Sequence, residues 1–74
     1  MTTAPHQLAF GRAVQAARQR MGMSQEELAE ALGMHRTQLG HIEQGRKDCR
    51  LSTILRVAAV LRMPASRLLR AAAL

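Results

Sequence analysis

The sequence predicts an all-α domain, and three observations support this prediction. The chain has 74 residues, so it holds one domain at most. Its apolar residues recur three and four positions apart over several short segments, as on one face of a helix. Phe10 is the only aromatic residue, so the core consists of Leu, Ile, Val, Met and Ala, which suit packed helices better than sheets.

The first predicted helix follows a flexible tail, residues 1–5, and spans His6 to Met21. Gly22 ends this helix, because glycine readily takes the left-handed conformation found after helices. The residues on its inner face are Phe10, Val14, Ala17 and Met21. We therefore expect a single domain over residues 6–74.

Ser24 and Glu27 predict the start of a second helix at Gln25. They have the spacing of a capping box, in which the serine caps the helix and the glutamate reaches back to the serine. Gly33 ends this helix in a left-handed conformation. Its inner face consists of Leu28, Ala29 and Leu32.

Three further helices are expected in the rest of the chain. The third spans Arg36–Gln44 and is followed by Gly45. The fourth spans Leu51–Leu61, and the fifth spans Pro64–Ala72, because proline cannot continue a helix but suits the first turn of the next one. The inward-facing side chains of the third and fourth helices would be Leu39, Ile42, Ile54, Leu55, Ala58 and Leu61.

Residues 25–44 form a helix-turn-helix in this prediction, with the turn at Gly33-Met34-His35. Ala29 lies four residues before the turn glycine, and its small side chain lets the two helices cross closely. The second of the two helices is left projecting from the bundle, as a helix that enters the major groove of DNA must.

The net charge of +6, from eleven basic and five acidic residues, points to a polyanionic partner, either nucleic acid or an anionic membrane surface. This charge is unevenly distributed. Residues 1–24 carry +3 and residues 49–74 carry +5, whereas residues 25–48 hold three basic and five acidic residues and carry −2. We therefore expect the long-range attraction to phosphate to come from the segments that flank the helix-turn-helix.

Three motifs follow one another in the chain: Met23-Ser24-Gln25-Glu26-Glu27-Leu28-Ala29, Leu32-Gly33 and Ile42-Glu43-Gln44-Gly45. This ordered set resembles the Cro/phage-repressor type of helix-turn-helix family, over about residues 10–69. The resemblance implies a compact five-helix fold like that of the lambda repressor, binding to operator DNA, and a homodimer. It also implies a structural ion pair between Arg18 and Glu43.

Geometry divides the third helix into a buried side and an exposed side. At 100° per residue, an inner face of Leu39 and Ile42 leaves the opposite side free. Arginine can place two donors on guanine, glutamine can pair with adenine, and threonine can contact a thymine methyl group or a phosphate. Base contacts are expected from Arg36, Thr37, Gln38 and His41. For Arg36 the alternative is a solvated charge or a phosphate contact.

Phosphate contacts are expected from residues near the helix ends: Ser24, Gln25, Gln44, Arg46 and Lys47. The assignment of Gln25 follows from the resemblance, and Ser24 is expected to cap its helix first. For Arg46 and Lys47 the alternative is a solvated loop. The sequence departs from the family at His35, where Ser or Thr is the usual N-cap, so the third helix is expected to be capped less well.

The last two helices carry more apolar surface than one small core needs, which predicts a two-fold dimer. The expected interface residues are Met63, Leu69 and Ala72. Such a dimer would place two copies of the third helix about 34 Å apart, on successive major grooves. The alternative is packing within one chain.

We therefore expect a sequence-specific transcriptional regulator that binds a palindromic operator as a homodimer and responds to its own concentration. His35-Arg36-Thr37 also resembles controller proteins of restriction–modification systems. The alternatives are an autoregulating antitoxin, a protein-interaction or adaptor module with the same fold, and a non-specific DNA or RNA binder.

Other classes of function find little support in the sequence. His6, His35, His41 and Cys49 match no metal-ligand spacing, so no metal or other cofactor is expected. No nucleophile–base set or glycine-rich phosphate loop indicates an enzyme. Signal-peptide features and an apolar run of about 20 residues are both missing, and a lone cysteine forms no disulfide within the chain. We expect a cytoplasmic, nucleoid-associated protein without a membrane or small-molecule partner.

Overall fold

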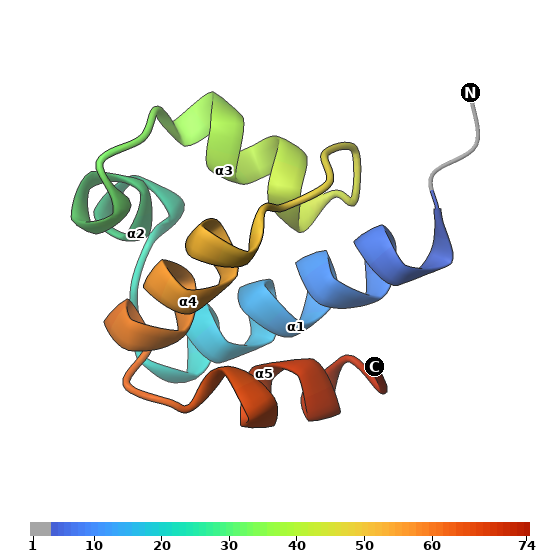
Figure 1. Ribbon diagram of the computed structural model, residues 1–74. Helices are drawn as coiled ribbons and strands as arrows, with labels where there is room; N and C mark the ends of the chain where they lie inside the picture. The colour runs from blue at the N-terminus through green and yellow to red at the C-terminus, as the bar shows by residue number, and fades with distance from the viewer. Residues whose placement is uncertain (1–3) are drawn as a thin grey trace.

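The computed structural model describes residues 4–74, and this part of the chain consists of five α-helices joined by short loops (Figure 1). The helices are α1 (Pro5–Arg20), α2 (Gln25–Leu32), α3 (Arg36–Glu43), α4 (Leu51–Val60) and α5 (Ala65–Ala71). The all-α, five-helix prediction is therefore confirmed. None of these helices is both long and apolar enough to cross a membrane.

α1 begins within the segment that the sequence assigned to the tail. Ala4 is the N-cap and Pro5 is the first helical residue. Proline suits this position because its missing N–H would have no partner in the first turn of a helix. Residues 1–3 of the expected tail lie outside the described residues.

The predicted ends of α3, α4 and α5 each extend one residue too far. Gln44, Leu61 and Ala72 are the C-caps of these helices rather than their last helical residues. Pro64 is the N-cap of α5, because its ψ of 146° is extended and places it just outside the helix. The helix-turn-helix itself has the predicted start and the predicted turn.

α1 runs through the middle of the molecule, with α3 on one side of it and α5 on the other (Figure 1). α2 packs against α3 and α4, and α4 packs against α5. The core lies between these helices and contains Phe10, Ala13, Val14, Ala17, Leu28, Ala29, Leu32, Leu39, Ile42, Val57, Ala58, Leu61, Leu68 and Ala72. α1 and α2 therefore cover the inner side of α3, and its outer face is left uncovered.

Two residues that were expected to face inward are exposed instead. Met21 is the C-cap of α1 and is 42% exposed, because the chain turns away from the core there. Leu55 is 52% exposed, because the buried side of α4 is centred on Val57 and Ala58. The predicted inner face of α4 was thus too wide, and it omitted Val57, which is fully buried.

Gly11 explains how closely α1 approaches α3. A Cβ atom at this position would overlap the carbonyl oxygen of Ile42 and would lie 2.6 Å from that of Glu43. The last turn of α3 therefore rests on the backbone of α1, and only glycine permits this contact. Gly11 could not be recognised from the sequence, because a glycine inside a helical pattern does not by itself reveal what packs against it.

Candidate DNA-binding surface

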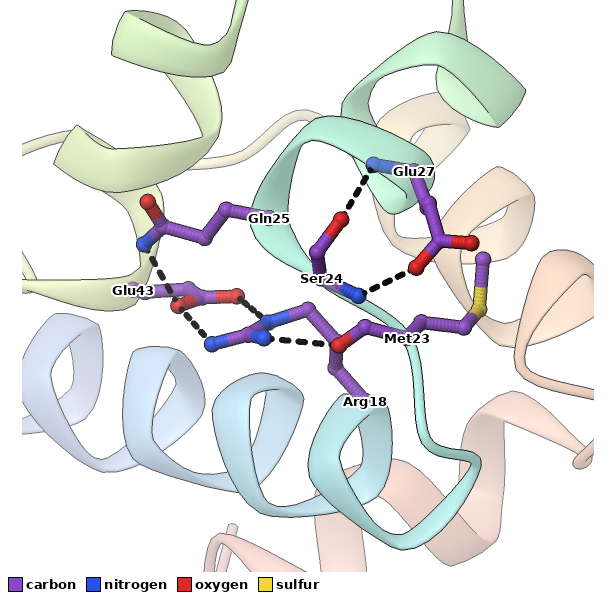
Figure 2. A network of polar contacts seen from close by, with 6 residues as sticks. All are labelled: Arg18, Met23, Ser24, Gln25, Glu27 and Glu43. Carbon is purple, nitrogen blue, oxygen red and sulfur yellow. Dashed lines mark hydrogen bonds and ion pairs between the residues drawn. The ribbon is translucent and has the colours of Figure 1, made fainter.

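The N-terminus of α2 is fixed by the capping box that the sequence predicts (Figure 2). The Glu27 backbone N–H donates to Ser24 Oγ at 3.1 Å, and the Ser24 backbone N–H donates to Glu27 Oε1 at 2.8 Å. These hydrogen bonds lower the pKa of Glu27 from its ordinary value of 4.5. Ser24 is exposed but already uses its hydroxyl oxygen as the cap, so any phosphate contact would come second to capping.

The turn between α2 and α3 is held by α4. Gly33 takes the left-handed conformation expected for it, with φ of 69°. The Arg56 guanidinium donates through Nη2 to the carbonyl oxygen of Leu32, the last residue of α2. A cation at this place neutralises the negative end of the helix dipole and gives a terminal carbonyl a partner. From the sequence, Arg56 was expected only to add to the positive charge of residues 49–74.

The N-terminus of α3 is capped from within the helix. His35 is the N-cap residue, and its backbone N–H donates to Gln38 Oε1 at 3.1 Å. The amide oxygen of Gln38 is therefore engaged in this structure, while its NH₂ group remains a donor. Pairing with adenine uses both the oxygen and the nitrogen of the amide, and the second lone pair of the Gln38 oxygen is available for it.

The outer face of α3 carries the predicted base-contacting side chains. Leu39 and Ile42 are buried, which fixes the rotation of the helix. Gly40 lies on the outer face of α3 and is partly exposed, and a Cβ atom at this position would have no neighbour within 4 Å. The exposed residues of this face are Arg36, Thr37, Gln38, His41 and Gln44.

A buried network joins the end of α3 to α1 and to the start of α2 (Figure 2). Arg18 Nε donates to Glu43 Oε2 at 2.8 Å, and Arg18 Nη2 donates to Glu43 Oε1 at 3.2 Å. Arg18 Nη1 also donates to the Met23 carbonyl oxygen at 2.8 Å. The two side chains are only 10% and 2% exposed, so the ion pair that the resemblance implied lies inside the molecule.

Gln25 belongs to the same network. Its Nε2 donates to Glu43 Oε1 at 2.9 Å, so the carboxylate accepts from two side chains and the amide is oriented by the buried pair. A glutamine amide has two N–H groups, and the second one remains free to donate to a phosphate. Gln25 can therefore be both a structural residue and the expected phosphate contact, which sequence spacing alone did not indicate.

A second arginine–glutamate pair lies on the surface at the other end of α3. Arg36 Nη1 is 3.4 Å from Glu26 Oε1, and the two side chains are 64% and 74% exposed. Water screens such a pair, and exposed pairs of this kind contribute about 0–1 kcal/mol to stability. Arg36 is thus held only weakly in the free protein.

The loop from α3 to α4 places further basic groups next to this surface. Arg46 and Lys47 are exposed, as a phosphate contact requires. A cavity of about 400 Å³ lies between this loop, the turn and α4, and its lining includes Gln38, Lys47, Arg50 and Arg56. The cationic groups of the loop therefore border the outer face of α3.

The remaining titratable groups are not arranged as a metal site. Burial raises the pKa of the Cys49 thiol, which favours its protonated form. His6 Nε2 lies 3.9 Å from an Asp48 carboxylate oxygen on the surface. Within residues 4–74, no three His, Cys, Asp or Glu side chains come together as they would around a metal ion.

The residues expected at a dimer interface are placed less favourably than predicted. Met63 and Leu69 are half-buried against the core of their own chain. Ala72 is only 7% exposed and is itself part of that core, so it has little surface to offer a second subunit. The large apolar side chains that are exposed on the last two helices and after them are Leu51, Leu55 and Leu74.

A family model described as helix-turn-helix matches residues 14–68. The chain belongs to the helix-turn-helix family. Its relatives include control protein C.SmaI of Serratia marcescens, which is 40% identical over 47 residues. That match covers 64% of this chain and 56% of C.SmaI, so the chain spans little more than half of that relative's length.

Two solved structures show that members of this family share the whole arrangement of helices. The clp gene regulator ClgR of Corynebacterium glutamicum superposes with a TM-score of 0.90 at 29% identity, covering 92% of this chain and 87% of ClgR. The restriction-modification controller protein C.AhdI of Aeromonas hydrophila gives a TM-score of 0.79 at 33% identity, covering 82% of this chain and 92% of C.AhdI. These relatives are thus a gene regulator and two controller proteins.

Proposed function

We propose that this helix-turn-helix protein is a sequence-specific DNA-binding regulator of transcription that inserts α3 into the major groove. The observation that carries the proposal is the arrangement of α3. Its inner side chains Leu39 and Ile42 are buried, its C-terminal end is fixed to α1 by Arg18 and Glu43, and its outer face is uncovered. A rigid helix with a polar, projecting face is what major-groove recognition requires.

The chemistry of the outer face suits base recognition. Arg36 presents a planar set of donors that fits the O6 and N7 atoms of guanine, and each such contact discriminates against a wrong base by about 1–3 kcal/mol. Thr37 can contact a thymine methyl group or a phosphate. His41 lies on the same exposed face, one turn further along the helix.

Phosphate contacts would fix the helix in register along the groove. Gln25 lies at the N-terminus of α2, where backbone N–H groups and the helix dipole also favour an anion. Arg46 and Lys47 lie beyond the other end of the helix-turn-helix, next to Gln44. These residues would hold the phosphates on both sides of the outer face of α3.

We further propose that the protein binds a palindromic site as a homodimer. Leu51 and Leu55 lie one turn apart on α4 and are 68% and 52% exposed, so together they form a small apolar patch on the surface. They join Met63 and Leu69 as candidates for the subunit contact, in place of Ala72. A two-fold dimer through this face would present two copies of α3 to one side of the duplex.

The similarity to C.SmaI and to C.AhdI favours a controller protein of a restriction–modification system as the specific kind of regulator. In this role the protein would act on nucleoid DNA, without enzymatic activity and without a small-molecule effector.

Selection of bound sites from random duplexes, followed by mobility-shift titration over a range of salt concentrations, tests this proposal. A DNA-binding regulator of this kind should select a palindrome and bind it at least about a thousandfold more tightly than random duplex. Affinity should fall steeply with salt, because each neutralised phosphate contributes about −0.9 to the log–log slope. Equal affinity for all duplexes would instead indicate a non-specific binder, and no DNA binding would indicate an adaptor module.

A further inference from the structure

We propose that Glu26 is a specificity-determining residue. Its carboxylate weakens the binding of a phosphate to the Arg36 guanidinium but leaves this guanidinium able to contact guanine. The inference rests on the proposed function, because it concerns how the outer face of α3 distinguishes one DNA sequence from others. Neither Glu26 nor its pairing with Arg36 belonged to the site expected from the sequence.

The geometry brings together the second residue of α2 and the first residue of α3. Glu26 Oε1 lies 3.4 Å from Arg36 Nη1, and both side chains extend into solvent. The fold does not need this contact in the way that it needs Arg18 and Glu43, which are nearly inaccessible to water. Glu26 also lies in the first turn of α2, where its negative charge favours the helix dipole, so its effect on Arg36 is separate from its effect on the helix.

The contact leaves part of the arginine available. A guanidinium has five N–H donors, and the pairing with Glu26 involves Nη1. The edge formed by Nε and Nη2 can still donate two parallel hydrogen bonds. Guanine O6 and N7 are neutral acceptors that match this edge, so Arg36 can contact guanine and Glu26 at the same time.

Phosphate differs from guanine because it carries a negative charge. A phosphate that bound the same edge of Arg36 would lie roughly 6 Å from the Glu26 carboxylate, and two like charges at this distance in water weaken binding about threefold. The penalty applies to contacts with the DNA backbone, which are alike in all sequences. Glu26 would thus weaken binding to random DNA more than binding to the correct site.

The other exposed acids of α2 provide a matched control. Glu27 is committed to the capping box, so its replacement would disturb the helix. Glu30 is exposed on the same helix, and among residues 4–74 the ion pairs that form do not include it. Glu30→Gln therefore changes the net charge as Glu26→Gln does, without removing an ion-pair partner of Arg36.

The experiment compares these two variants with the unmodified protein on a selected palindrome and on a random duplex of equal length, at several salt concentrations. We expect Glu26→Gln to bind random duplex about threefold more tightly and the palindrome less than twofold more tightly. On random duplex its log–log salt slope should steepen by about 0.9, as for one added phosphate contact. Glu30→Gln should change both affinities by the same small factor and leave the slope unchanged.

The proposal would be overturned if Glu26→Gln and Glu30→Gln behaved alike, since only net charge would then matter. It would also be overturned if Glu26→Gln lost affinity for the palindrome while binding random duplex unchanged, because Glu26 would then assist recognition directly. In both cases the unmodified protein would still prefer the palindrome, and the proposed function would stand. A failure of the proposed function is recognised separately, by the lack of any preference in the unmodified protein.

Discussion

Within residues 4–74, the two arginine–glutamate pairs have the same chemistry and opposite surroundings. Arg18 and Glu43 lie between α1 and α3, are 10% and 2% exposed, and approach to 2.8 Å. Arg36 and Glu26 lie at the other end of α3, are 64% and 74% exposed, and approach only to 3.4 Å. One pair is surrounded by protein partners, whereas the other is surrounded by water.

This difference separates the residues that hold α3 in place from those that are free to bind. A buried charge without its partner lowers the free energy of unfolding, so the loss of either Arg18 or Glu43 should destabilise the fold. An exposed pair gains little, because solvent already stabilises both charges. The guanidinium edge of Arg36 that Glu26 does not contact can therefore exchange water for another acceptor at small cost.

The largest expected effect comes from breaking the buried pair. Arg18→Met leaves the Glu43 carboxylate buried without its cation, which should lower the free energy of unfolding by about 3–5 kcal/mol. A domain of this size has only roughly 4–11 kcal/mol in total, so this loss is a large share of its stability. Urea denaturation followed by circular dichroism measures the change.

The matched change at the exposed pair is Arg36→Met. It should lower the free energy of unfolding by less than about 1 kcal/mol in the same urea titration. If the two variants lost equal stability, the distinction between a structural pair and a surface pair would be wrong.

Two glycines extend the comparison to the backbone of the same two regions. Gly11→Ala places a Cβ against the carbonyl oxygens at the end of α3, and the resulting overpacking should lower the free energy of unfolding by about 1–3 kcal/mol. Gly40→Ala meets no atom within 4 Å and should raise it by about 0.5–1 kcal/mol, because alanine favours the helix. Thermal melts of both variants test this, and a melting temperature that rises for Gly11→Ala would contradict the packing described for α1 and α3.

The smallest expected effect concerns Glu27, a third glutamate whose partner is the backbone. Its pKa is lowered in the folded state, so its ionised form contributes stability above the ordinary carboxyl value of 4.5, and this contribution is lost as the pH falls through the lowered pKa. Glu27→Gln should therefore melt slightly below the unmodified protein at pH 7, and the difference should vanish in acid. A difference that stayed constant from pH 7 to pH 3 would show that the charge of Glu27 has no part in the capping box.

Local signals in the sequence predicted most of the fold. Ser24 and Glu27 fixed the start of α2, Gly33 fixed the turn, and the buried side of α3 followed from the spacing of Leu39 and Ile42. These features depend on residues within a few positions of one another, which is why periodicity and capping patterns reveal them.

What the sequence did not reveal depends on contacts between distant segments. Gly11 meets α3, Arg56 caps α2, and Gln25 donates to Glu43, each across 18 or more positions. The error at Leu55 has the same origin, because the burial of a face of α4 is decided by where α2 and α5 pack against it. The assignment of Arg36, Thr37, Gln38 and His41 to base contacts stays a prediction.

The most direct test of the account compares Arg36→Ala with Lys47→Ala in mobility-shift titrations on the selected palindrome and on random duplex. Because Arg36 is expected to contact a base, Arg36→Ala should lose about 1–3 kcal/mol of preference for the palindrome and relax selection at one base pair in each half-site. Lys47→Ala should weaken binding to both duplexes by the same factor and make the salt slope shallower by about 1, as the loss of one phosphate contact requires. The opposite pattern, with sequence preference lost in Lys47→Ala and kept in Arg36→Ala, would contradict the assignment of the outer face of α3 as the surface that recognises DNA sequence.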